Sequence, residues 1–169
     1  MEQNLDNKIE LKDKFISLYN KNKSKIYLLI AFVFIAIISI TVFKIIEERK
    51  NIAISEKYIK ANLYLTADKI NQSKVLYEEI INSENKFYSV LALNKLIEKD
   101  LEKNKEKIVS YFIKIEKLKF SKENKELLLL KKALYLIKNS SVEEGNKILN
   151  ELINSNSSIK SIAKEVLIN

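Results

Sequence analysis

The residues IYLLIAFVFIAIISITVF, from Ile26 to Phe43, decide how the rest of this chain is arranged. None of them is charged, and only Ser39 and Thr41 interrupt the apolar run with small polar side chains. At 1.5 Å per residue, a helix of this length reaches about 27 Å, close to the ~30 Å hydrocarbon core of a bilayer. A buried core helix usually carries a polar stripe at the helical period, and this run has none. The run therefore predicts a single transmembrane helix over residues 26–46.

The residues after the run favour an uncleaved anchor over a removable signal peptide. The apolar core of a signal peptide spans about 7–15 residues and ends at a site of small residues. This run is longer, and the residues that follow it, KIIEERK at 44–50, contain no such site. Lys44 can reach the lipid headgroups, which lets Ile45 and Ile46 lengthen the apolar segment.

Residues 1–25 form a short polar segment before the predicted span. Their apolar side chains recur at roughly helical spacing, so the segment is either a weakly amphipathic helix on the membrane surface or a frayed tail. The 15 residues before the span hold five Lys, and the 15 residues after it hold four basic residues. This difference is too small for the positive-inside rule to set the orientation.

The composition predicts an all-α fold. The 169 residues include one Gly and no Pro, Cys, His or Trp. Sheet proteins depend on Gly and Pro for their turns, and this chain has almost none of either. About 123 residues follow the span, which is enough for one compact helical domain over residues 47–169.

The same composition argues against an enzyme, a metal site and a cofactor. Without His or Cys the chain lacks Ser–His triads, thiol nucleophiles and the usual zinc ligands. Its single glycine, Gly145, cannot build a phosphate-binding glycine loop. We therefore expect no catalytic, cofactor-binding or metal-binding residue and no small-molecule substrate. The net charge of +8 does not indicate nucleic acid, because 29 of the 30 basic residues are Lys and they alternate with Glu on predicted helix surfaces.

Short polar joints divide the region after the span into segments of helical length. No Gly or Pro interrupts residues 44–68, so the span is expected to continue into the first of these segments as one helix. Joints this short place consecutive helices side by side in antiparallel pairs. The predicted helices cover residues 51–67, 72–82, 86–101, 105–118, 123–138, 142–154 and 158–167.

An internal repeat relates the first and last helix pairs of this region. A shift of 72 residues aligns EIINS at 79–83 with ELINS at 151–155. Half of this shift is close to the 34-residue unit of a tetratricopeptide repeat, although residues 86–118 fit the pattern poorly. In each outer copy, small residues mark where two helices approach closely, and bulky residues fill the space beside them. The predicted packing residues are Ala61, Tyr64, Ser73, Tyr77, Ala133, Leu136, Gly145 and Leu149.

The packing set resembles the tetratricopeptide consensus, without its early Trp, its Gly beside the close contact and its terminal Pro. The order of a short basic N-terminus, one span and a small repeat domain is similar to that of the ancillary subunit of the bacterial Sec translocon. That family belongs with the tetratricopeptide-like domain of the cell-division coordinator proteins, and the resemblance covers nearly the whole chain. Family members usually carry a Trp-rich stretch and a Gly before the span, where this chain has Phe15, Tyr19 and Asn22.

The resemblance implies a single-pass protein of the bacterial inner membrane. It places residues 1–25 in the cytoplasm and the helical domain in the periplasm. The implied partners are the Sec translocon, emerging proteins and the periplasmic chaperones to which those proteins are passed.

The resemblance also implies a groove for partner proteins. In tetratricopeptide-like stacks the first helix of each pair lines the concave side. On the predicted helix 51–67, we take the face turned away from the packing contact, and the 72-residue shift extends it to the last pair. The result is a mostly apolar stripe suited to hydrophobic or amphipathic segments. The predicted groove residues are Tyr58, Asn62, Leu65, Leu130, Leu134 and Ile137. Two alternatives remain open: these residues are ordinary core, or the chain is a structural subunit of another inner-membrane complex with no such groove.

Overall fold

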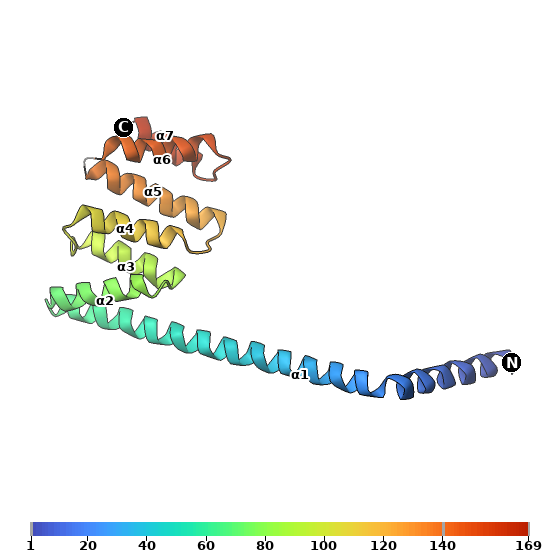
Figure 1. Ribbon diagram of the computed structural model, residues 1–169. Coiled ribbons are helices and arrows are strands. Elements are labelled where there is room, and N and C mark those ends of the chain that lie inside the picture. The colour runs from blue at the N-terminus through green and yellow to red at the C-terminus, as the bar shows by residue number, and fades with distance from the viewer. Residues whose placement is uncertain (1, 140, 169) are drawn as a thin grey trace. The chain divides into compact units, whose positions relative to one another are not determined.

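The computed structural model describes residues 2–139 and 141–168, and these form seven α-helices and no strand. The helices are α1 (Glu2–Thr66), α2 (Ile70–Asn82), α3 (Lys86–Glu98), α4 (Lys105–Glu116), α5 (Lys122–Lys138), α6 (Val142–Asn154) and α7 (Lys160–Ile168), as Figure 1 shows. The all-α fold predicted from the scarcity of Gly and Pro is confirmed. The chain divides into two compact units, Met1–Lys50 and Asn51–Asn169.

The first unit contains the apolar run. Residues 26–43 are helical throughout, and the described part of the chain buries none of the apolar window. The hydroxyl of Ser39 donates a hydrogen bond to the carbonyl oxygen of Ile35 (2.8 Å), and that of Thr41 donates to Ile37 (2.9 Å). Both hydroxyls therefore find acceptors within their own helix and need no water. Among the described residues, α1 is the one helix long and apolar enough to cross a membrane.

The segment before the apolar run is also helical. α1 begins at Glu2, and the described backbone continues through residue 25 without a break. The amphipathic surface predicted for residues 1–25 depends partly on the side chains of residues 2–13, 15 and 18, which lie outside the described part of the structure.

The helices of the second unit end close to the predicted positions. α3 stops at Glu98 rather than at residue 101, because Asp100 adopts a positive φ of 50°. The backbone N–H of Leu101 then donates to the carbonyl oxygen of Leu96 (2.9 Å) and closes the helix end. α1 ends in the same way at Asp68, whose φ is 57°. Glycine usually fills such left-handed positions, and in this nearly glycine-free chain acidic residues occupy them.

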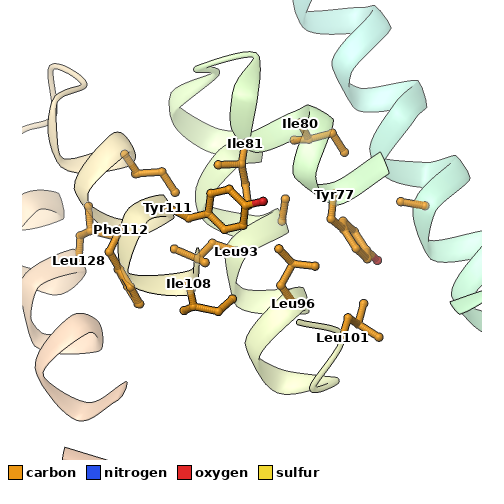
Figure 2. Close-up of a cluster of buried hydrophobic side chains, with 13 residues drawn as sticks. Tyr77, Ile80, Ile81, Leu93, Leu96, Leu101, Ile108, Tyr111, Phe112 and Leu128 are labelled. Atoms are coloured by element: carbon orange, nitrogen blue, oxygen red, sulfur yellow. The ribbon is translucent and has the colours of Figure 1, made fainter. Parts of the chain in front are cut away.

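Two hydrophobic clusters hold the second unit together, and α5 contributes to both. The larger cluster lies mainly among α2, α3 and α4, with Ala61 from α1 and Leu128 from α5. Figure 2 shows its side chains converging between these helices. The smaller cluster lies among α5, α6 and α7, where Leu149 and Ala163 are fully buried. Each helix from α2 to α7 packs on the next along the chain, and the helices form a stack in chain order (Figure 1).

The predicted packing residues lie at or beside close contacts between paired helices. The hydroxyl of buried Ser73 in α2 donates to the carbonyl oxygen of Ala61 in α1 (2.9 Å). In the last pair, a Cβ atom added to Gly145 of α6 would lie 2.8 Å from the carbonyl oxygen of Ala133 in α5. The two contacts are related by the 72-residue shift. Of the bulky residues, Tyr77, Leu136 and Leu149 are buried, and Tyr64 is half-buried.

A cluster of charges joins α2 to the α3–α4 joint and the start of α4. The carboxylate of Glu102 is only 6% exposed and lies 2.9 Å from the ammonium of Lys74 and 3.0 Å from that of Lys107. Lys107 also pairs with Glu78 at 2.6 Å. Burial opposes ionisation of Glu102, but the backbone N–H of Asn104 and the two ammonium groups outweigh it and lower its pKa to about 2.

The Gly145 contact predicts that Gly145→Ala destabilises the protein. On an unconstrained helix this change would stabilise by up to about 1 kcal/mol, because Ala has the higher helix propensity. Here the new Cβ would meet a backbone oxygen that cannot rotate away and the side chain of Ile137 at 2.5 Å. We expect a net loss of about 1–3 kcal/mol, measured by thermal melting of the full chain in detergent with circular dichroism. Asn150→Ala, at an exposed position of the same helix, is the control and should change stability by less than about 0.5 kcal/mol. A more stable Gly145→Ala variant would contradict the close contact.

The low pKa of Glu102 predicts a specific loss of stability in acid. Its carboxyl titrates near 4.5 in the unfolded chain and near 2 in the folded one, so the folded state binds fewer protons between these values. The stabilisation is complete above about pH 4.5 and disappears as the pH falls toward 2. At pH 7, Glu102→Gln should cost about 1–3 kcal/mol, because Lys74 and Lys107 lose the buried carboxylate between them, although Lys107 keeps its pair with Glu78.

The comparison of the two proteins at several pH values tests this assignment. The difference in melting temperature between the wild type and Glu102→Gln should shrink steadily from pH 5 to pH 2.5. Glu98→Gln is the matched control, because Glu98 is 59% exposed and pairs only with Lys95 at 3.3 Å. A difference between wild type and Glu102→Gln that does not change with pH would show that the carboxylate does not hold this joint.

Candidate functional site

The structure does not assemble the six predicted groove residues into an open groove. The ring of Tyr58 packs against those of Tyr77 (5.8 Å between centroids) and Tyr88 (5.7 Å). Asn62 accepts a hydrogen bond from the hydroxyl of Tyr77 (3.0 Å), and Leu65 packs against the larger cluster. This face of α1 is therefore covered by α2 and α3.

The equivalent residues of α5 are divided between core and surface. Leu130 is buried in the smaller cluster, and Ile137 packs against that cluster and beside Gly145. Leu134 is 42% exposed. The groove assignment is corrected on this point: α2 and α3 cover the chosen face of α1, and Leu130 and Ile137 of α5 pack in or against the smaller cluster.

The strongest candidate for a binding site is a cleft of about 540 Å³ between α3 and α5. It is formed by the first helices of the second and third pairs, together with the joint that leads into α5. The lining residues are Lys86, Phe87, Val90, Leu91, Asn94, Lys119, Phe120, Ser121, Asn124, Leu127, Leu128 and Lys131. The volume falls within the range of about 300–1,000 Å³ that is common for ligand pockets.

The side of the cleft on α3 is set by the cap of that helix. The side chain of Asn85 accepts hydrogen bonds from the backbone N–H groups of Phe87 (3.1 Å) and Tyr88 (3.0 Å), which fixes where α3 begins. Residues 87, 90, 91 and 94 then fall on one face at helical spacing. Phe87 is 64% exposed at this face, while Val90 also packs against the larger cluster.

The side of the cleft on α5 repeats this arrangement 37 residues later. Ser121 caps the helix by accepting a hydrogen bond from the backbone N–H of Asn124 (3.3 Å). Residues 124, 127, 128 and 131 share the face that lines the cleft. Leu128 is buried beneath it, and Leu127 is 45% exposed. The ammonium of Lys131 reaches across to the side-chain oxygen of Asn94 on α3 (3.2 Å), which links the two sides.

The charged residues that line the cleft are all positive. Lys86, Lys119 and Lys131 lie among its lining residues, and the lining contains no Asp or Glu. Each lysine in the charge cluster on α2 and α4 contacts at least one carboxylate, as Lys107 does with Glu78 and Glu102. Lys132 of α5 pairs in the same way with Glu116 of α4 at 2.8 Å. The cleft therefore combines an apolar floor with cations that lack carboxylate partners in the described part of the chain.

The groove predicted from the sequence and the cleft share one helix, α5: the predicted residues lie on α1 and α5, whereas the cleft lies between α3 and α5. The prediction placed the groove on the first helix of each pair, and α3 and α5 are such helices. Phe87 lies in the middle pair, which matches the repeat poorly, and Leu127 lies on a face of α5 other than the predicted stripe. The available signal was the pattern of residues 87, 90, 91 and 94, which recurs at 124, 127, 128 and 131. Both sets follow a capping residue, Asn85 or Ser121.

Comparison of this chain with models of known protein families, with curated proteins and with solved structures finds no match.

Proposed function

We propose that this chain is a membrane-anchored protein-interaction module whose cleft between α3 and α5 binds a segment of a partner protein. The observation that carries this proposal is the cleft itself, with the exposed side chains of Phe87 and Leu127 at its two sides. Exposed apolar side chains that converge on one concave site are typical of surfaces that bind another molecule.

We further propose that the domain is a tetratricopeptide-like array of helix pairs. Three features support this arrangement. The second helices begin at Ile70, Lys105 and Val142, which are 35 and 37 residues apart. The close contacts of the first and last pairs obey the 72-residue shift. Each helix from α2 on packs on its neighbour in the chain, as expected for a repeat array.

The proposed location is the inner membrane of a bacterium, with residues 1–25 in the cytoplasm and the helical domain in the periplasm. The apolar run in α1 supports the membrane anchor. The order of segments supports an accessory subunit of the Sec translocation machinery that contacts emerging proteins or periplasmic chaperones. A cleft with exposed apolar side chains suits such partners, because unfolded chains and amphipathic segments present apolar residues.

The proposal predicts that Leu127→Asp weakens partner binding. A carboxylate at this position would be desolvated by a bound apolar segment, so the amount of co-purified partner should fall about tenfold or more. The measurement is quantitative affinity purification of the full chain from detergent-solubilised membranes of its own cells. Because Leu127 is partly exposed, the substitution should leave the melting temperature nearly unchanged.

Leu134→Asp is the matched control for this experiment. Leu134 lies on the same helix, is exposed to a similar degree and does not line the cleft. We expect it to retain wild-type levels of partner. If Leu134→Asp loses the partner while Leu127→Asp retains it, the site is the stripe predicted from the sequence. If neither variant loses the partner, the chain acts as a scaffold without this binding site.

The proposed anchor predicts that charges in the apolar run release the chain from membranes. The wild type should stay in the membrane pellet after alkaline carbonate extraction. Lys in place of both Ile35 and Ile38 adds about 2.5–3.5 kcal/mol per residue to the cost of insertion and should move the chain to the supernatant. Lys in place of Ile59 and Leu63, which are exposed in the second unit, should have no such effect. Release of the wild type by carbonate would overturn the anchor.

A further inference from the structure

We infer that the segment bound in the cleft is acidic and amphipathic: a short stretch of a partner protein with apolar side chains flanked by Asp or Glu. This inference rests on the proposed function and adds the chemistry of the partner to it. It follows from two features of the cleft between α3 and α5: its floor is apolar, and every charged residue that lines it is a lysine.

The lysines of the cleft are available to a partner. Lys86 and Lys119 are exposed and have no carboxylate within ion-pair distance in the described part of the chain. Lys131 is held by the neutral side chain of Asn94, so its charge is not compensated either. Three cations around one concave site raise the local concentration of negatively charged segments and disfavour basic ones.

The cleft is distinctive because its lysines surround exposed apolar side chains. Residues 51–169 contain 21 Lys and 16 Asp or Glu, so an excess of positive charge is general. On α2 and α4, however, lysines and carboxylates form a compact cluster around Glu102. The excess charge at the cleft coincides with exposed Phe87 and Leu127, so apolar contact and charge attraction act on the same segment.

The apolar floor argues for a protein segment rather than for a free anion. A small anion would use the lysines and leave Phe87, Val90 and Leu127 uncovered. On each helix the cleft face extends over eight residues, 87–94 and 124–131, and its ends are about 10 Å apart. That length accommodates a few side chains of one segment, with anchors about every third or fourth residue if the segment is helical.

A peptide-binding experiment tests the inference with the full chain in phosphatidylcholine nanodiscs. The probe is a fluorescent 12-residue peptide with Leu and Phe at positions i, i+3, i+4 and i+7 and Glu at the flanking positions. Two further peptides carry Gln or Lys in place of Glu. Fluorescence anisotropy is measured against loaded and empty nanodiscs, so that binding of each peptide to lipid is subtracted.

The acidic peptide should bind at least tenfold more tightly than the Gln peptide at low salt, and this advantage should shrink as salt rises. Replacement of Lys86, Lys119 and Lys131 by Ala should remove the advantage. The matched control replaces Lys138, Lys147 and Lys164, three exposed lysines outside the cleft, and should retain it. Leu127→Asp should weaken binding of both peptides, because both use the apolar floor, and of the acidic peptide more, because the new carboxylate offsets part of the lysine charge.

Other results would overturn the inference in distinguishable ways. Equal binding of all three peptides, sensitive to Leu127→Asp, would overturn the acidic character and leave the cleft as a binding site. Tighter binding of the Lys peptide than of the acidic one would also overturn the acidic character and leave the cleft as a binding site. If no peptide binds and Leu127→Asp converts a dimer into monomers, a second copy of this chain occupies the cleft. If no peptide binds and Leu127→Asp also retains the cellular partner, the proposed function itself fails at this site.

Discussion

The close approach of two helices within a pair is the constraint on which the second unit depends. At Ala61 and Ser73, and again at Ala133 and Gly145, one helix presents a backbone oxygen to a position that holds a very small residue. Where the small residue is Ser, its hydroxyl also gives that oxygen a hydrogen-bond donor. A larger side chain at either position would push the helices apart and disturb the interdigitation of their neighbours. The stack of α2 to α7, and with it the placement of α3 beside α5, therefore depends on a few positions with little side-chain volume.

Two buried carboxylates, those of Glu102 and Glu126, add hydrogen bonds and ion pairs to the apolar packing of the domain. The α3–α4 joint contains no Pro to stiffen it, and Glu102 fixes it by accepting from a backbone N–H and from two lysines. Glu126 has a similar role at the other end of the domain, where it accepts from the backbone N–H and the hydroxyl of Ser158 just before α7. In both places a nearly buried carboxylate is stable because hydrogen bonds compensate for lost water.

The sequence was sufficient to predict the helices and insufficient to predict which faces they bury. Turn residues were scarce and the joints were short and polar, so each predicted helix of the second unit matches an observed one within a few residues. The repeat shift also located the small residues at the close contacts.

The face of a first helix is harder to predict, because it packs in two directions at once. Tyr58 packs on both α2 and α3, and Leu130 lies in the smaller cluster with residues of α6 and α7, so both are core positions. Phe87 and Leu127 look like core by residue type, yet they remain exposed because no helix of the second unit covers them.

The division of the core into two clusters has a consequence for how the domain opens. The smaller cluster, with six buried residues, contains α6, α7 and one side of α5, while the larger one, with thirteen, holds α2, α3 and α4 together. Local unfolding follows such boundaries, because each cooperative unit loses its buried contacts together. We therefore expect amide hydrogens of α6 and α7 to exchange with solvent through partial openings that leave α3 and α4 protected. On this expectation the C-terminal end of the domain is a separable cap that opens and closes while the larger cluster stays packed.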